Sequence, residues 1–285
     1  MRMQKLFWAL IWIGFAPTTE AQYYYSDLIG IRQVETKQQR FKTLHVRQIL
    51  GTAVLPTGEV QTDFKESYEL SFQADTLQQI QVQAGARTNT TLIFSNNGQL
   101  MEQMEKRAGF TSQITYSRNK QGYIDRIENR FSDSLSEFQQ REIHLWSYNA
   151  TGSPLKMWRI LEKIDGVLDS TEIQLTIDST GLVTEERSFK RGRETGFFYY
   201  YYNESGQITD IVRFNSKFNR LLPDQLFEYD AAGNMTQRMQ LTGSRDVTYL
   251  IFRYGYQTNG LLSEEALFNN RKEHQGSIRF SYLFR

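Results

Sequence analysis

The side chains that most often carry chemistry are few in this 285-residue chain and lie far apart. There is no cysteine, and the three histidines, His45, His144 and His274, are isolated from one another along the chain. Local metal sites usually use His or Cys residues a few positions apart, so we expect no metal. The glycine-rich loops of nucleotide sites and the Gly-x-Ser-x-Gly of serine hydrolases are also missing, so we expect no cofactor.

Two pairs of adjacent glutamates, Glu185-Glu186 and Glu264-Glu265, could in principle supply the two carboxyl groups of a glycoside hydrolase. Both pairs begin at the same position of a sequence repeat that is described below. At this position other copies of the repeat carry Arg, Lys, Asp or Gln. A column that accepts either sign of charge is typical of a solvated surface. We therefore identify no catalytic residue, and the sequence favours a protein that is not an enzyme.

The most unusual local feature is an unbroken aromatic run from Phe197 to Tyr202. Aromatic rings exposed on one face of a strand can stack on sugar rings or contact apolar partners. Alternatively, every second ring lines the core and the others pack beneath neighbouring hairpins. The candidate binding residues are therefore Tyr199 and Tyr201, together with Trp146 and Trp158.

Composition limits the partners that such residues could serve. The chain has 33 Lys+Arg and 32 Asp+Glu, a formal net charge of +1, which gives no electrostatic reason to expect nucleic acid. A hydrophobic content of 39% argues against wholesale disorder.

The first residues are organised like a secretory signal peptide. Arg2 and Lys5 precede an uncharged, mostly apolar run from Leu6 to Ala16, and Thr19-Glu20-Ala21 offers small residues for cleavage. The apolar run is shorter than the roughly 20 residues of a transmembrane helix, and no later stretch reaches that length. We therefore expect a protein exported to the periplasm, the cell surface or the medium, without a transmembrane helix.

Most of the remaining chain repeats one phrase, in which Ser, Asn, Asp or Gln is followed three residues later by glycine. The glycines that end the phrase are Gly98, Gly122, Gly152, Gly181, Gly206, Gly233 and Gly260. A large aromatic or apolar residue stands four positions before the glycine in six copies. An Asx side chain that bonds the backbone ahead, followed by a glycine with φ > 0, is typical of a tight turn.

The segments on both sides of these turns alternate apolar and polar residues, which indicates half-buried strands. Consecutive hairpins predict an all-β antiparallel meander of about nine hairpins and 18 or 19 strands. A lone hairpin is marginally stable, so the aromatic residues before the glycines are expected to form a shared spine. The segment from Ser132 to Gln140 is an exception to this pattern of strands, because its sequence is also compatible with a short helix. The chain then divides into a signal peptide over 1–21, a lead-in over 22–46 and one repeat domain over 47–285.

The copy Tyr229-Asp230-Ala231-Ala232-Gly233-Asn234 resembles the core phrase of YD repeats, which are known from RHS-type secreted bacterial proteins. The other copies resemble degenerate versions, and the likeness covers most of residues 47–285. It implies one long sheet that curls into a shell or superhelix, in an exported bacterial protein. Large members of that family enclose a toxic C-terminal domain, which we do not expect here.

Three functions fit these features. The favoured one is a non-enzymatic scaffold or binding protein of the bacterial cell envelope, with an envelope protein or a polysaccharide as partner. The second is an outer-membrane β-barrel, although charges on both faces of the strands after the turns argue against it. The third is a secreted carbohydrate-binding or carbohydrate-active protein, which would use the exposed aromatic rings.

Overall fold

The computed structural model describes residues 23–134, 138–163, 166, 168–215, 219–242 and 248–285. Within these residues the chain forms one helix, α1 (Ser26–Thr43), and 18 strands. The strands are β1 (Val46–Val54), β2 (Phe64–Leu70), β3 (Thr76–Gln83), β4 (Ala86–Phe94), β5 (Leu100–Arg107), β6 (Phe110–Arg118), β7 (Ile124–Asp133), β8 (Phe138–Tyr148), β9 (Pro154–Lys163), β10 (Leu168–Ile177), β11 (Val183–Lys190), β12 (Arg193–Tyr202), β13 (Ile208–Asn215), β14 (Arg220–Tyr229), β15 (Met235–Thr242), β16 (Thr248–Tyr256), β17 (Leu262–Phe268) and β18 (His274–Phe284).

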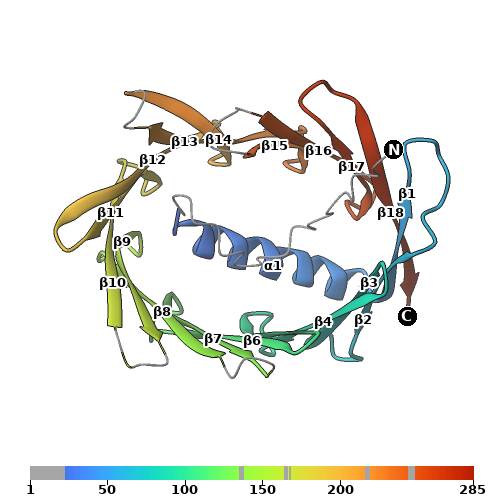
Figure 1. Ribbon diagram of the computed structural model, residues 1–285, viewed down its shortest axis with the longest axis horizontal. Coiled ribbons are helices and arrows are strands. Elements are labelled where there is room, and N and C mark those ends of the chain that lie inside the picture. Colours follow the sequence, from blue (N-terminus) through green and yellow to red (C-terminus); the bar gives the residue numbers. More distant parts are fainter. Residues whose placement is uncertain (1–22, 135–137, 164–165, 167, 216–218, 243–247) are drawn as a thin grey trace.

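The sheet closes on itself into a β-barrel (Figure 1). Each strand pairs antiparallel with its sequence neighbours, and β1 pairs with both β2 and β18. The predicted all-β meander is therefore confirmed, whereas the open shell or superhelix is wrong. The reason is that β1 and β18 match over eight residue pairs, so the two ends of the sheet satisfy each other's backbone groups.

The glycine phrases form tight turns, as predicted, and all of them lie at one end of the barrel, which we call the glycine-turn end. In the β10–β11 turn the Asp178 carboxylate accepts hydrogen bonds from the backbone N–H groups of Thr180 and Leu182, at 2.9 and 3.0 Å. Gly181 has φ +88°, a conformation that glycine adopts without steric penalty. Each turn is therefore fixed by its own local sequence.

The aromatic spine is confirmed and is also hydrogen-bonded. At each of the seven glycine turns the strand register shifts by one residue, a β-bulge, as between Tyr201 and Tyr202. At four of these turns, and at Tyr282 of β18, a tyrosine hydroxyl donates to the carbonyl two residues after the glycine of an earlier turn. These bonds are Tyr148 to Ile124 (2.6 Å), Tyr202 to Val183 (2.6 Å), Tyr229 to Ile208 (2.8 Å), Tyr256 to Met235 (2.9 Å) and Tyr282 to Leu262 (2.7 Å).

Helix α1 occupies most of the predicted lead-in and lies across the interior of the barrel (Figure 1). Its 18 residues span about 27 Å at 1.5 Å per residue. Ile31 and Phe41 on the helix are buried in the same apolar cluster as the wall residues Leu100 and Met157. The main core of the protein is thus inside the barrel, between the helix and the wall.

Two sequence-based expectations concern segments at the limits of the described residues. A short helix over Ser132 to Gln140 is wrong for the described part, because Ser132 belongs to β7 and Gln140 to β8, which pair with each other. Residues 135–137 and the predicted signal peptide over 1–21 lie outside the described residues. Among the described residues we find no helical segment with the length and hydrophobicity of a membrane span.

We predict that Tyr202→Phe lowers the free energy of unfolding by about 1 kcal/mol, because it removes the hydroxyl that donates to the Val183 carbonyl and is also hydrogen-bonded with Tyr25. Urea denaturation measures the change. Tyr201→Phe is the matched control, since Tyr201 is the adjacent tyrosine, faces outward and is 47% exposed. Equal effects of the two substitutions would show that the hydroxyl spine does not stabilise the barrel.

Candidate functional site

The two faces of each strand are identified by contact with α1. His144 of β8 contacts Asp27 of the helix, so it faces inward. Its neighbour Ile143 therefore faces outward, as does Glu128, which lies opposite Ile143 on β7. This alternation separates an inner site around the helix from an outer wall.

The N-terminal end of α1 is held by a buried chain of charged groups. His144 Nδ1 lies 2.5 Å from Asp27 Oδ2, and Nε2 lies 2.9 Å from Glu142 Oε1. Arg159 of β9 donates to the other oxygen of Glu142 at 2.5 Å. Burial alone would lower the pKa of His144, but the two carboxylates raise it to about 9. Burial would likewise raise the pKa of Glu142, yet His144 and Arg159 hold it at about 2.

A second carboxylate binds the start of the helix directly. Glu186 of β11 accepts the backbone N–H groups of Tyr24 and Tyr25 at 2.7 and 2.8 Å, and the Tyr200 hydroxyl at 2.8 Å. The side chain is fully buried, and this burial raises the pKa of Glu186 to about 7 against the opposing effect of its hydrogen bonds. Glu186 therefore fixes the position of the residues that directly precede the helix.

The rest of the helix is tied to other parts of the wall. Glu35 accepts from Arg118 of β6 at 2.5 Å and from the Leu100 backbone N–H at 2.7 Å. Near the C-terminal end, Arg40 donates to the Gly260 carbonyl at 2.6 Å, and Lys42 donates to a carbonyl of the β4–β5 turn. These contacts place α1 close to the glycine-turn end.

This inner site is suited to holding the helix rather than to catalysis. Both nitrogens of His144 face carboxylates, so neither is left to activate a nucleophile. In the described part of the chain no group of three His, Cys, Asp or Glu residues could hold a metal ion.

The residues proposed for binding fall on different faces. Tyr199 and Tyr201 both face outward on β12, and the Tyr199 ring lies 4.4 Å from that of Phe197. Trp158 is also outward and 38% exposed, but β9 is separated from β12 by two strands. Trp146 is 5% exposed and packs in the inner core. The structure therefore brings only the two tyrosines together.

The interpretation of the glutamate pairs as solvated is correct for Glu185 and Glu264 and wrong for Glu186 and Glu265. Adjacent residues of a strand point to opposite faces, so the second glutamate of each pair faces inward. Burial raises the pKa of Glu265 to about 7, as it does for Glu186. The missed signal is the column five residues after the glycine, which faces inward in every copy: Gln103, Ile127, Met157, Glu186, Ile211, Arg238 and Glu265.

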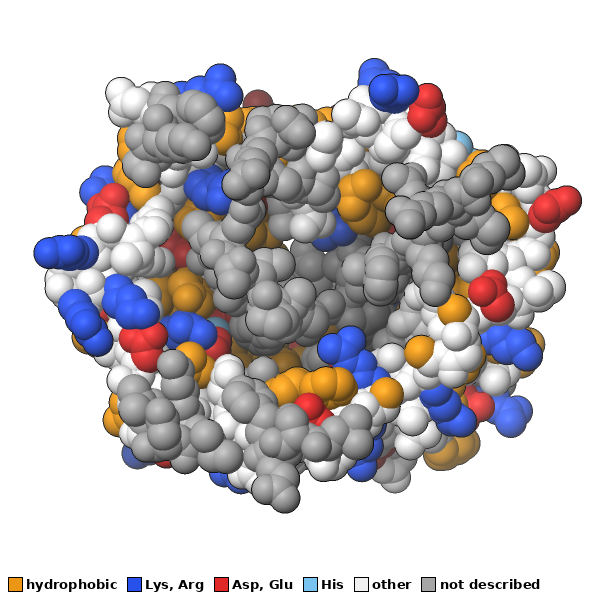
Figure 2. Space-filling model, in the orientation of Figure 1, with side chains coloured by type: hydrophobic (Ala, Val, Ile, Leu, Met, Phe, Trp, Pro, Cys, Tyr) orange, Lys and Arg blue, Asp and Glu red, His pale blue; other side chains and the backbone are white. Residues whose placement is uncertain are grey.

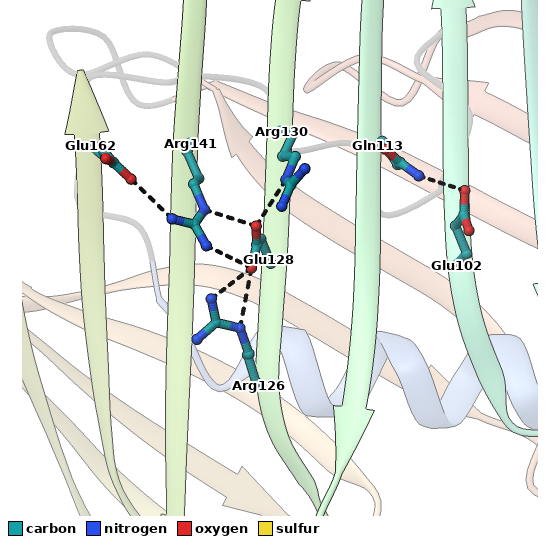
Figure 3. A network of polar contacts seen from close by, with 7 residues as sticks. All are labelled: Glu102, Gln113, Arg126, Glu128, Arg130, Arg141 and Glu162. Atoms are coloured by element: carbon teal, nitrogen blue, oxygen red, sulfur yellow. Dashed lines mark hydrogen bonds and ion pairs between the residues drawn. The ribbon is translucent and has the colours of Figure 1, made fainter. Parts of the chain in front are cut away.

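The outer wall carries a network of charges centred on Glu128 (Figure 3). Its carboxylate contacts the guanidinium groups of Arg126, Arg130 and Arg141 at 2.6, 2.9 and 2.8 Å. Arg141 continues to Glu162 of β9 at 3.1 Å. Hydrogen bonds from these arginines, that of Arg141 above all, lower the pKa of Glu128 to about 2. The network therefore joins three strands through charged groups on the outside.

Outward ion pairs recur around the barrel. They join Lys156 to Glu172 (2.6 Å), Arg187 to Glu185 (3.6 Å) and Arg279 to Glu264 (3.3 Å). Figure 2 shows acidic and basic side chains spread around the margin of the molecule. The guanidinium of Arg187 also lies 4.0 Å from the Phe197 ring centroid, so a charge lies over part of the aromatic run.

No protein-family model and no curated protein sequence matches the chain. Among solved structures it is similar to a porin-like protein from Bacteroides uniformis, with 10% identity, coverage of 84% of this chain and 98% of that one, and a TM-score of 0.38. A porin-like protein from Bacteroides vulgatus has the same identity and coverage and a TM-score of 0.31. The TcdB2-TccC3-Cdc42 structure is 11% identical over 78% of this chain and 15% of that chain, with a TM-score of 0.32. Barrel closure is established by this chain's own strand pairing.

We predict that the free energy of unfolding falls as the pH rises from about 5 to 9. The pKa of Glu186 is raised from 4.5 to about 7, so the stabilisation from its proton is lost between these values. For His144, with a pKa raised from 6.5 to about 9, stabilisation is complete below pH 6.5 and is lost as the pH rises through 9. The His144 contribution is on the order of 3 kcal/mol.

Urea denaturation at a series of pH values measures this dependence. His144→Gln should flatten the decline between pH 6.5 and 9, whereas His274→Gln, a histidine remote from the helix contacts, should keep it. A decline that is unchanged in His144→Gln would contradict the assignment of a charged histidine beside Asp27.

Proposed function

We propose that this chain is an exported, non-enzymatic protein of the bacterial cell envelope, a water-exposed β-barrel whose outer wall serves as a binding surface. The charged outer wall around Glu128 is the observation that carries this proposal. The signal-like residues 1–21 and the resemblance of the repeat to YD repeats support export and a bacterial setting.

The distribution of polarity supports water rather than lipid outside the barrel. A lipid-embedded barrel presents an apolar band outward, where an Arg or Lys costs about 2–4 kcal/mol at the bilayer midplane. Here Arg126, Arg130 and Arg141 face outward from the middle of β7 and β8. The large apolar cluster is instead inside, around α1.

Insertion into the outer membrane is the second candidate. Closure of the barrel favours it, because closure leaves no strand edge to satisfy within a bilayer. Outward apolar residues are also concentrated on one side of the barrel, over β12 to β16. They include Phe197, Tyr199, Val212, Phe214, Leu226, Met239 and Ile251.

Fractionation of a Gram-negative host that expresses the full chain separates the two candidates. We predict that the protein is released into detergent-free buffer by osmotic shock, and that alkaline washing leaves none in the membranes. The reason is that the outward ion pairs are stable in water and costly in lipid. A resident porin and a periplasmic enzyme of the same cells serve as controls. Recovery only in detergent, together with the porin, would favour the membrane barrel instead.

A further inference from the structure

An open groove of about 760 Å³ crosses the outer face at the end opposite the glycine turns. Its floor is a row of outward side chains from five adjacent strands, β4 to β8. The row consists of Asn89, Lys106, Thr111, Ser132 and Gln139, each paired in register with the next. Strands lie about 4.8 Å apart, so the row extends over roughly 19 Å.

Every side chain in this row can form hydrogen bonds to a ligand. The amides of Asn89 and Gln139 and the hydroxyls of Thr111 and Ser132 both donate and accept, whereas the ammonium of Lys106 only donates. A sugar hydroxyl also donates and accepts, so this row is complementary to a hydroxyl-rich chain. The regular spacing suits an extended polymer better than a small molecule, which would require a more enclosed pocket.

The groove also has an excess of positive charge. The exposed cations on its outer side are Arg87 and Lys106, whereas Arg107 and the one carboxylate that lines it, Asp133, lie at the rim on the inner side of their strands. Arg107 Nε lies 3.9 Å from the Glu105 carboxylate, a weak pair that is exposed to water. A ligand that brings carboxylates could therefore form charge-assisted hydrogen bonds here.

The tip of the β5–β6 hairpin forms one edge of the groove, and its Phe110 ring lies on the inner side of the strands because Phe110 alternates with the outward Thr111. The Phe110 ring lies 5.7 Å from that of Phe131 and 5.6 Å from the guanidinium carbon of Arg107. The backbone N–H of Ser134 donates to the Gly109 carbonyl at 3.0 Å, which holds this hairpin tip against the end of β7. The groove is therefore formed by contacts between neighbouring hairpins.

We propose that this groove binds an acidic polysaccharide, a chain of sugars that carry carboxylate groups, laid across β4 to β8. The site specifies the ligand class of the proposed binding protein. It rests on the proposed function because it requires an outer wall that faces water. Lys106 and Arg87 bind the carboxylates, and the amide and hydroxyl row binds the sugar hydroxyls. The site is distinct from the aromatic run on β12.

The test measures binding of the purified full chain to polygalacturonate by isothermal titration calorimetry, with neutral dextran as the reference polymer. Binding to polygalacturonate should weaken with added salt, and dextran should bind at least tenfold more weakly. The double variant Arg87→Gln/Lys106→Gln should lose at least tenfold in affinity, because it removes two charge-assisted contacts.

Lys120→Gln is the matched control and should change the affinity less than twofold. Lys120 is also an exposed cation, but it lies in the β6–β7 glycine turn, at the other end of the same strands. Lys106→Glu should weaken binding further than Lys106→Gln, and circular dichroism confirms that each variant remains folded.

Three results would overturn the site. They are equal binding of dextran, an unchanged affinity in the double variant, and binding of inorganic polyphosphate without binding of polygalacturonate. None of them affects the proposed location of the barrel, because fractionation measures that separately. Conversely, a barrel extracted only by detergent would remove the water-exposed wall on which the groove depends.

Discussion

The width of an 18-stranded barrel is the constraint on which the rest of the structure depends. Eight strands enclose a space that wall side chains can fill, whereas 16 to 18 strands leave an open channel. Inward side chains of opposite walls therefore cannot meet across this lumen. Helix α1 solves the problem, since Ile31 and Phe41 provide an apolar surface against which the wall packs. Without the helix, the inward apolar residues would be exposed to water inside the barrel.

A helix in such a wide space must also be held in one orientation, and buried polar contacts do this. Asp27 and the backbone of Tyr24 bind β8 and β11, while Arg40 binds a turn on the opposite side. Buried ion pairs contribute little net stability because desolvation offsets their attraction. Their role here is to specify the position of the helix, because any other arrangement would leave Glu186 or His144 buried without its partners.

Local features of the sequence predicted the wall well, and non-local ones could not be predicted. The turn at Asp178 and Gly181 is determined within four residues, and every spine tyrosine except Tyr282 follows from its fixed distance to a glycine. Closure depends on pairing between β1 and β18, which are at opposite ends of the chain and share no local pattern. The buried carboxylates were not predicted because both glutamates of a pair were assigned to the one position of the repeat that accepts either sign of charge, although the strand period turns Glu186 inward beside an outward Glu185. The helix had a readable signal as well, since its apolar residues recur at helical spacing: Leu28, Ile31, Val34 and Phe41.

The two ends of the barrel differ in a way that bears on function. At the glycine-turn end, repeated turns and the hydroxyl spine fix every hairpin in the same geometry, and α1 packs beneath them. The connections at the other end range from two residues between β3 and β4 to nine between β1 and β2. Connections that vary in length are where binding residues are usually placed on a rigid scaffold. The groove beside Lys106 lies at this variable end, so a regular frame there supports a surface whose side chains are not constrained by the repeat.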